Sequence, residues 1–188
     1  AIRNYKNALL VKPKYAEAQN NLGNAFKDLG KLDLAIELYE KAIVIKPDFP
    51  EAFDNLVVVL KEFDQLEVAI NSYQKVITAN PKLAQAHHNL GLVLQLSSQN
   101  EEAIKCYEKA IAIRPNYPEA HNNIGIVYKE LGQLEDAIKS YEKSLTINPD
   151  FAEAHNNLGN VLRELNHLNE AAECFNKVIA IQPNFAET

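Results

Sequence analysis

One stretch of sequence, YPEAHNNIGIVY at residues 117–128, decides how the chain folds, because it returns four more times in edited form. The other copies begin at residues 15, 49, 83 and 151, and a proline stands two residues before each copy. Successive prolines are therefore 34 residues apart, as from Pro13 to Pro47. A constant period of this size is typical of a solenoid, in which each repeat buries its apolar face only on its neighbours.

Each period contains two helical patterns separated by a turn. In residues 18–29 and again in residues 32–43, apolar side chains recur three and four positions apart, which is the spacing of one face of an α-helix. Between the two patterns stands a residue type that is typical of helix ends, because glycine, aspartate and asparagine tolerate left-handed backbone; serine is the weakest of the set. The predicted turn residues are Gly30, Asp64, Ser98, Gly132 and Asn166.

Several columns of identical residues run through the repeats. A glycine follows the leucine of the first helix at Gly23, Gly91, Gly125 and Gly159, and an alanine column begins at Ala35. An aromatic column contains Tyr39, Tyr73, Tyr107, Tyr141 and Phe175. This pattern resembles the tetratricopeptide repeat (TPR) family along the whole chain.

The resemblance implies an all-α fold, a right-handed α-solenoid (superhelix) of antiparallel helix pairs with a 34-residue period. It also implies that the first helix of each repeat lines the concave face. Two features depart from the family pattern. Val57 breaks the glycine column, so we expect the two helices of that repeat to be pushed slightly apart. The early tryptophan of the family is replaced at Gln19, Phe53, His87, His121 and His155, and we expect the histidines to pack between helices.

The repeat boundaries follow from the period. Residues 1–15 are predicted to contain the second helix of a truncated repeat, and five whole repeats follow within one solenoid domain. These are residues 16–49, 50–83, 84–117, 118–151 and 152–185. Because the pattern starts in mid-repeat, we expect the chain to be a fragment of a longer protein.

The composition narrows the classes of partner. The formal net charge is −6 and the calculated pI is about 5.4, without a basic run, which argues against binding to nucleic acid or to an anionic membrane. No apolar run is long enough to span a bilayer. Cys106 and Cys174 occupy the same position two repeats apart, too far to form a disulfide, which favours a reducing, cytoplasmic compartment.

The candidate binding site lies on the first helices. The sixth position of every repeat is asparagine, and we call these five residues the amide row: Asn21, Asn55, Asn89, Asn123 and Asn157. The ninth positions, which we expect to line the same groove, are Asn24, Val58, Leu92, Ile126 and Asn160. An asparagine amide carries donors and an acceptor, so it can pair with the backbone of an extended peptide whatever the peptide's sequence.

The amide row is similar to the asparagine ladder in the repeat arm of the nucleocytoplasmic O-GlcNAc transferases. That resemblance implies that these five residues hold the backbone of an extended ligand. The alternatives are that they bond within the scaffold or that they descend by duplication from an ancestral repeat. Likewise, Val58, Leu92 and Ile126 are either an apolar contact for the ligand or half-buried packing residues.

No pattern of catalytic or metal-binding residues appears in the sequence. His87, His121 and His155 each lie a full repeat apart, so they cannot converge on one metal ion. Glycine-rich phosphate loops, nucleophile motifs and paired cysteines are not found either. The sequence therefore predicts a protein that is not an enzyme and that uses no cofactor or metal.

The sequence predicts a protein–protein interaction scaffold that binds an extended peptide or partner segment in a concave groove. One alternative is self-association into a homo-oligomer through the solenoid ends, because neither terminal helix shows the polar face of a capping helix. A second alternative is that the repeats form the substrate-recognition arm of a larger enzyme, such as a glycosyltransferase.

Overall fold

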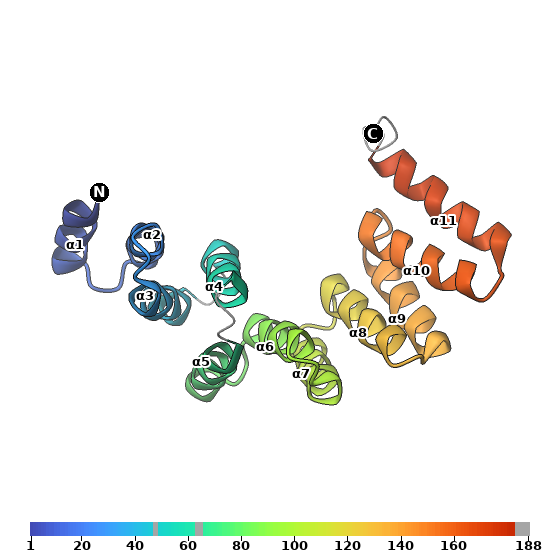
Figure 1. The fold of residues 1–188 in the computed structure, drawn as a ribbon, viewed down its shortest axis with the longest axis horizontal. Coiled ribbons are helices and arrows are strands. Elements are labelled where there is room, and N and C mark those ends of the chain that lie inside the picture. Colours follow the sequence, from blue (N-terminus) through green and yellow to red (C-terminus); the bar gives the residue numbers. More distant parts are fainter. Residues whose placement is uncertain (47–48, 63–65, 183–188) are drawn as a thin grey trace. The chain divides into compact units, whose positions relative to one another are not determined.

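The computed structural model describes residues 1–46, 49–62 and 66–182, and all regular structure in these ranges is helical (Figure 1). The first helices of the repeats are α2 (Ala16–Lys27), α4 (Pro50–Glu62), α6 (Ala84–Leu96), α8 (Pro118–Glu130) and α10 (Ala152–Glu164). The second helices are α1 (Ile2–Val11), α3 (Leu32–Ile45), α5 (Leu66–Ala79), α7 (Asn100–Ile113), α9 (Leu134–Ile147) and α11 (Leu168–Ile181). The helix–turn–helix repeats predicted from the sequence are thus confirmed.

The chain divides into two compact units. Unit 1 spans Ala1–Ser97 and contains α1 to α6, and unit 2 spans Ser98–Thr188 and contains α7 to α11. Inside each unit, every helix packs against the next helix in the chain. Two pairs of first helices from consecutive repeats also touch, α2 with α4 and α8 with α10. This is the nearest-neighbour packing of a solenoid.

Small and aromatic columns form the core of both units. The alanines of the second helices are fully buried at Ala35, Ala69, Ala103 and Ala137. The tyrosines of the same helices are equally buried: Tyr39, Tyr73, Tyr107 and Tyr141. One core cluster joins Tyr141 of α9 to Val161 of α10 and Ala171 of α11, so the core is continuous from one repeat to the next.

The glycine column exists because the aromatic ring of the second helix lies directly on it. A Cβ atom added at Gly125 would lie 2.6 Å from Cε1 of Tyr141, and one added at Gly23 would lie 2.6 Å from Cε1 of Tyr39. At Gly159 the nearest atom is Cε1 of Phe175, at 2.8 Å. No side chain fits at such distances unless the ring moves.

The repeat at residues 50–83 has Val57 where most other repeats have glycine. Its tyrosine, Tyr73, stacks on Phe53, with ring centroids 6.2 Å apart and an interplanar angle of 13°. Among the described residues, α4 and α5 share the smallest contact of the helix pairs that form a repeat within one unit. This agrees with the expected separation of the two helices.

The turns within repeats have the predicted left-handed backbone. The φ angle is 68° at Gly30, 60° at Ser98, 74° at Gly132 and 65° at Asn166. The fifth predicted turn residue, Asp64, lies outside the described residues. Glycine adopts such angles freely, asparagine at some cost and serine at a greater cost.

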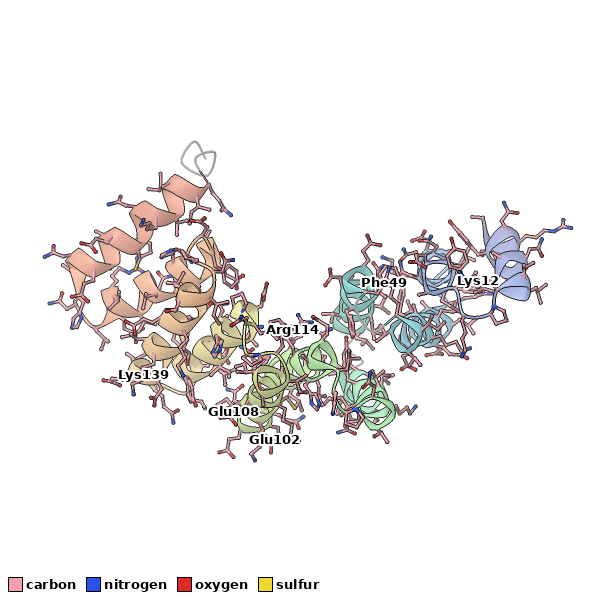
Figure 2. The ribbon with its side chains drawn as sticks, turned by 180° about the vertical axis from the view of Figure 1, so that it is seen from behind. Lys12, Phe49, Glu102, Glu108, Arg114 and Lys139 are labelled. Atoms are coloured by element: carbon pink, nitrogen blue, oxygen red, sulfur yellow. The ribbon has the colours of Figure 1, made fainter. Side chains whose placement is uncertain are left out.

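The loops between repeats share a cation–π contact in three places. The charged group lies over the aromatic ring for Lys12 and Tyr15 (5.0 Å to the centroid), for Lys46 and Phe49 (4.6 Å), and for Arg114 and Tyr117 (4.7 Å). Lys12, Phe49 and Arg114 mark these three loops in Figure 2. The aromatic residue directly precedes the next first helix, so the contact ties the loop to the start of that helix.

Both cysteines are free thiols. Cys174 is buried and Cys106 is half-buried, and burial raises the pKa of each thiol above its ordinary value. A thiol with a raised pKa is a poor nucleophile, so the two side chains have the character of packing residues. In the part of the chain that the structure describes, no helix combines the length and apolar character needed to cross a membrane.

Candidate functional site

The amide row lies on the first helices of both units, at graded depths. Asn21 is exposed, whereas Asn55, Asn123 and Asn157 are half-buried and Asn89 is buried. The first three of the five belong to unit 1, and Asn123 and Asn157 belong to unit 2.

Asparagines of neighbouring repeats hydrogen-bond to one another in each unit. In unit 1, Asn55 Nδ2 donates to Asn20 Oδ1 at 3.0 Å. In unit 2, Asn157 Nδ2 makes the equivalent bond to Asn122 Oδ1 at 3.1 Å. The acceptors Asn20 and Asn122 are almost fully buried, at 3% and 1% exposure. Asn55 and Asn157 therefore each use one N–H to bridge to the preceding repeat, while the second N–H and the carbonyl oxygen keep bonding capacity.

Asn89 is held within its own helix. Gln85 Nε2 donates to Asn89 Oδ1 at 3.1 Å, and His88 Nδ1 lies 3.1 Å from the same oxygen. His88 stands where other repeats have asparagine or aspartate, and it is 6% exposed. The amide of Asn89 is thus the most firmly fixed of the row.

The ninth positions differ among themselves. Val58 is 42% exposed, whereas Leu92 and Ile126 are half-buried, and Ile126 packs against the core cluster of unit 2. Both polar members contact the scaffold: Asn24 Oδ1 accepts a 2.7 Å bond from the hydroxyl of Tyr39, and Asn160 Oδ1 accepts a 3.1 Å bond from Arg163 Nη2.

Two acidic residues beside the row are also engaged within the scaffold. Glu17 forms an ion pair with Lys46 at 2.9 Å, and this hydrogen bond holds the pKa of the Glu17 carboxyl below its usual value. In unit 2, Asn122 Nδ2 donates to Glu153 Oε1 at 3.1 Å, so Asn122 links two side chains of the following repeat. Sequence reasoning missed these partners because they depend on the register between repeats.

The side chains that replace the family tryptophan bind the loop before their helix. The Nε2 atom lies 3.0 Å from the carbonyl oxygen of Pro81 in His87 and 2.8 Å from that of Pro149 in His155. Gln19 reaches the carbonyl of Pro13 in the same way, at 3.5 Å. In these three repeats the side chain thus fastens the first helix to its preceding loop, whereas Phe53 of α4 has no polar group that could do so. The described residues contain no group of three or more His, Cys, Asp or Glu side chains that could hold a metal ion.

The packed helix pairs define a helical-repeat protein, and sequence comparison specifies its family. A profile described as TPR repeat matches residues 1–30, 64–98, 96–132 and 127–162. A second profile, described as Tetratricopeptide repeat, matches residues 16–49 and 152–185. The chain belongs to the tetratricopeptide repeat family. No curated protein matches the sequence.

Solved structures with the same fold cover most of the chain. MamA is 26% identical, with a TM-score of 0.68 over 89% of this chain and 98% of that chain. YrrB, described as a TPR protein with an unusual peptide-binding site, is 22% identical, with a TM-score of 0.62 over 97% of this chain and 94% of its own. PilF of Pseudomonas aeruginosa is 22% identical, with a TM-score of 0.69 over 88% of this chain and 75% of that chain. These likenesses show the TPR solenoid fold.

Proposed function

We propose that the chain is a protein-interaction scaffold that binds an extended segment of a partner along its amide row. The observation that supports this most is the inter-repeat bond, which fixes the orientation of Asn55 and Asn157 before any ligand arrives. Preorganised side chains lose little conformational freedom on binding, so more of each new hydrogen bond appears as affinity. YrrB, a structure with the same fold, is described as having a peptide-binding site.

The groove presents mainly backbone-type chemistry. Asn55 and Asn157 each keep an N–H donor and a carbonyl acceptor for a ligand, and Val58 adds an exposed apolar contact in unit 1. A net hydrogen bond contributes about 1 kcal/mol, and ordering a flexible segment costs part of that gain. We therefore expect dissociation constants on the order of micromolar for a single linear motif.

The same hydrogen bonds also serve the competing explanation, in which the amide row only stabilises the stack. The two explanations differ in whether the donor asparagine of each bond has a role in ligand binding that the acceptor asparagine lacks. Asn55 and Asn157 are partly exposed, whereas their acceptors Asn20 and Asn122 are buried. Alanine at either side removes the same inter-repeat bond, but only the exposed side removes a group that a ligand can reach.

The test begins with selection of binding peptides from a random library displayed against the whole chain. The affinity of an enriched peptide is then compared between two double variants, Asn55→Ala/Asn157→Ala and Asn20→Ala/Asn122→Ala. We expect the first pair to lose at least about tenfold more affinity than the second, which corresponds to ~1.4 kcal/mol. Urea denaturation of both pairs controls for differences in folding, since Asn122 also binds Glu153.

Failure to enrich any extended motif, or equal losses in the two pairs, would assign the amide row to the scaffold alone. Self-association through the solenoid ends and a role as the substrate arm of a larger enzyme stay predictions. So do the expectations that the chain is not an enzyme and binds no nucleic acid or membrane.

A further inference from the structure

Unit 2 contains two crevices of the same construction, one repeat apart, away from the amide row. The first, here called the α7–α9 crevice, has a volume of about 410 Å³ and lies among α7, α8 and α9. The second, the α9–α11 crevice, has a volume of about 320 Å³ and lies among α9, α10 and α11. Because equivalent repeat positions line both, differences between them come from side-chain identity.

Both crevices have an apolar floor and one histidine. In the α9–α11 crevice the floor contains Leu158 and Leu162, which are 8% and 6% exposed, and His155 lines the wall. The equivalent residues of the α7–α9 crevice include Ile124 and His121. Each crevice therefore offers a patch that favours an aliphatic chain over water.

The charges of the α7–α9 crevice balance. Two acidic residues, Glu108 and Asp136, and two basic residues, Lys139 and Lys143, line it. Lys139 also pairs with Asp136 at 2.9 Å, so part of this charge is neutralised inside the crevice. Glu108 from α7 and Lys139 from α9 are labelled in Figure 2. A charged ligand gains little from such a rim.

The α9–α11 crevice carries an excess of negative charge. Three carboxylates, Glu142, Glu170 and Glu173, stand against the single base Lys177. Glu173 occupies the repeat position that Lys139 has in the other crevice, so an acid replaces the base that would pair with its neighbour. Glu170 lies 3.4 Å from His167 Nδ1, a contact that is an ion pair only when that imidazole is protonated.

His155 adds an acceptor without a partner. Its Nε2 atom lies 2.8 Å from the carbonyl oxygen of Pro149, and a carbonyl only accepts, so Nε2 carries the proton of the neutral ring. The other ring nitrogen, Nδ1, is then an acceptor, and it is buried with no hydrogen-bond partner among the described residues. His155 therefore adds no positive charge to offset the carboxylates in this neutral, Nε2-protonated form.

We propose that the α9–α11 crevice is a docking site for one lysine or arginine side chain presented by a partner protein. The aliphatic stem would lie on Leu158 and Leu162, and the cationic end would lie among the three carboxylates. The volume is at the lower end of ligand pockets, which run from ~300 Å³, so it suits one side chain and not a helix. This site does not depend on the amide row, so either proposal can fail alone.

The test uses the whole chain and a short neutral peptide with one central lysine, Ac-Ala-Ala-Lys-Ala-Ala-NH₂. The same peptide with acetyl-lysine lacks the charge and serves as its matched control. Binding is followed by NMR through the methyl resonances of Leu158 and Leu162, which the native chain provides as local reporters. Two variants exchange the residue that distinguishes the crevices: Glu173→Lys and Lys139→Glu.

We expect saturable shifts of the Leu158 and Leu162 resonances with the lysine peptide and none with the acetylated one. Glu173→Lys should weaken binding at least about fivefold, and Lys139→Glu should create a second response, at Ile124 in the α7–α9 crevice. Equal shifts from both peptides, or no effect of Glu173→Lys, would overturn the proposal. A response to spermidine without a response to the lysine peptide would overturn it as well, because the ligand would then be a free polyamine.

Discussion

Where the two helices of a repeat meet, glycine is required because an aromatic ring occupies the space of its side chain. Gly125 lies against the ring of Tyr141, which is fully buried and has little room to move. Alanine has a higher intrinsic helix propensity by ~1 kcal/mol, yet its methyl group would lie inside the contact distance of the ring. The free-energy cost of this clash exceeds the gain in helix propensity, because a close-packed core transmits strain to several neighbouring side chains.

We expect Gly125→Ala to lower the free energy of unfolding by about 1–2 kcal/mol in urea denaturation. In a double-mutant cycle, Tyr141→Leu should absorb part of this cost, since the smaller side chain gives the methyl group room. Additive effects of the two substitutions would show that the ring is not the obstacle.

A second prediction concerns the left-handed turn residues. Ser98 has φ 60°, so Ser98→Gly should raise the free energy of unfolding by about 0.5–1 kcal/mol. Asn166→Gly is the matched control and should gain less, because asparagine tolerates φ 65° better than serine does. The reverse change, Gly132→Ser, should destabilise. The thermal midpoints of the three variants measure these changes. A lower midpoint for Ser98→Gly would contradict the idea that left-handed backbone at Ser98 costs stability.

Helices and loops are joined by the side chains that replace the family tryptophan. Burial lowers the pKa of His121 below its ordinary value, the positive charge of Lys143 lowers it further, and a bond to the carbonyl of Pro115 partly opposes both. The folded protein therefore prefers the neutral imidazole. Its contribution to stability is complete above the ordinary histidine value of ~6.5 and is lost as the pH falls below it toward the folded value.

The variant His121→Gln should be less sensitive to acid than the native chain. Glutamine can still donate to the loop carbonyl, as Gln19 does, and it has no proton to gain. Urea midpoints measured at about pH 7.5 and pH 5 should fall less for the variant than for the native protein. An equal fall in both would assign the acid sensitivity to other groups.

The sequence predicted the elements well and the contacts between repeats poorly. Local spacing predicts the period, the turns and the glycine, alanine and aromatic columns, because the same pattern of residues recurs in each repeat. The bond from Asn55 to Asn20 depends on how far one first helix is shifted along the next, which no residue type encodes. The charge of the α9–α11 crevice likewise depends on Glu142, Glu170 and Glu173 coming from two second helices.

Along the repeats, the protein distributes its stability over many similar helix–helix contacts, and four of the second helices contribute a fully buried tyrosine. Burial raises the pKa of Tyr39 to about 12, and it also raises the pKa of Tyr73, Tyr107 and Tyr141. These raised values favour the neutral form in the folded state. The corresponding stability is complete below the ordinary tyrosine value of ~10 and is lost as the pH rises through the folded values.

We expect the thermal midpoint to fall steeply above about pH 10. Tyr39→Phe should flatten this fall, because one ionisable group is removed, although it should lower stability at neutral pH through loss of the bond to Asn24. Thermal unfolding followed by circular dichroism over this pH range provides the measurement. A variant with an unchanged alkaline slope would show that Tyr39 does not contribute to it.

The tyrosine column also gives the protein a built-in optical reporter. The chain contains eight tyrosines and no tryptophan, so its near-ultraviolet absorbance comes mainly from phenol groups. In mild alkali the core tyrosines stay neutral while their repeats are folded, and each becomes tyrosinate when its seam opens. At one fixed alkaline pH, the tyrosinate absorbance would then rise each time a repeat with a buried tyrosine unfolds. This rise would follow partial unfolding of the solenoid without any label.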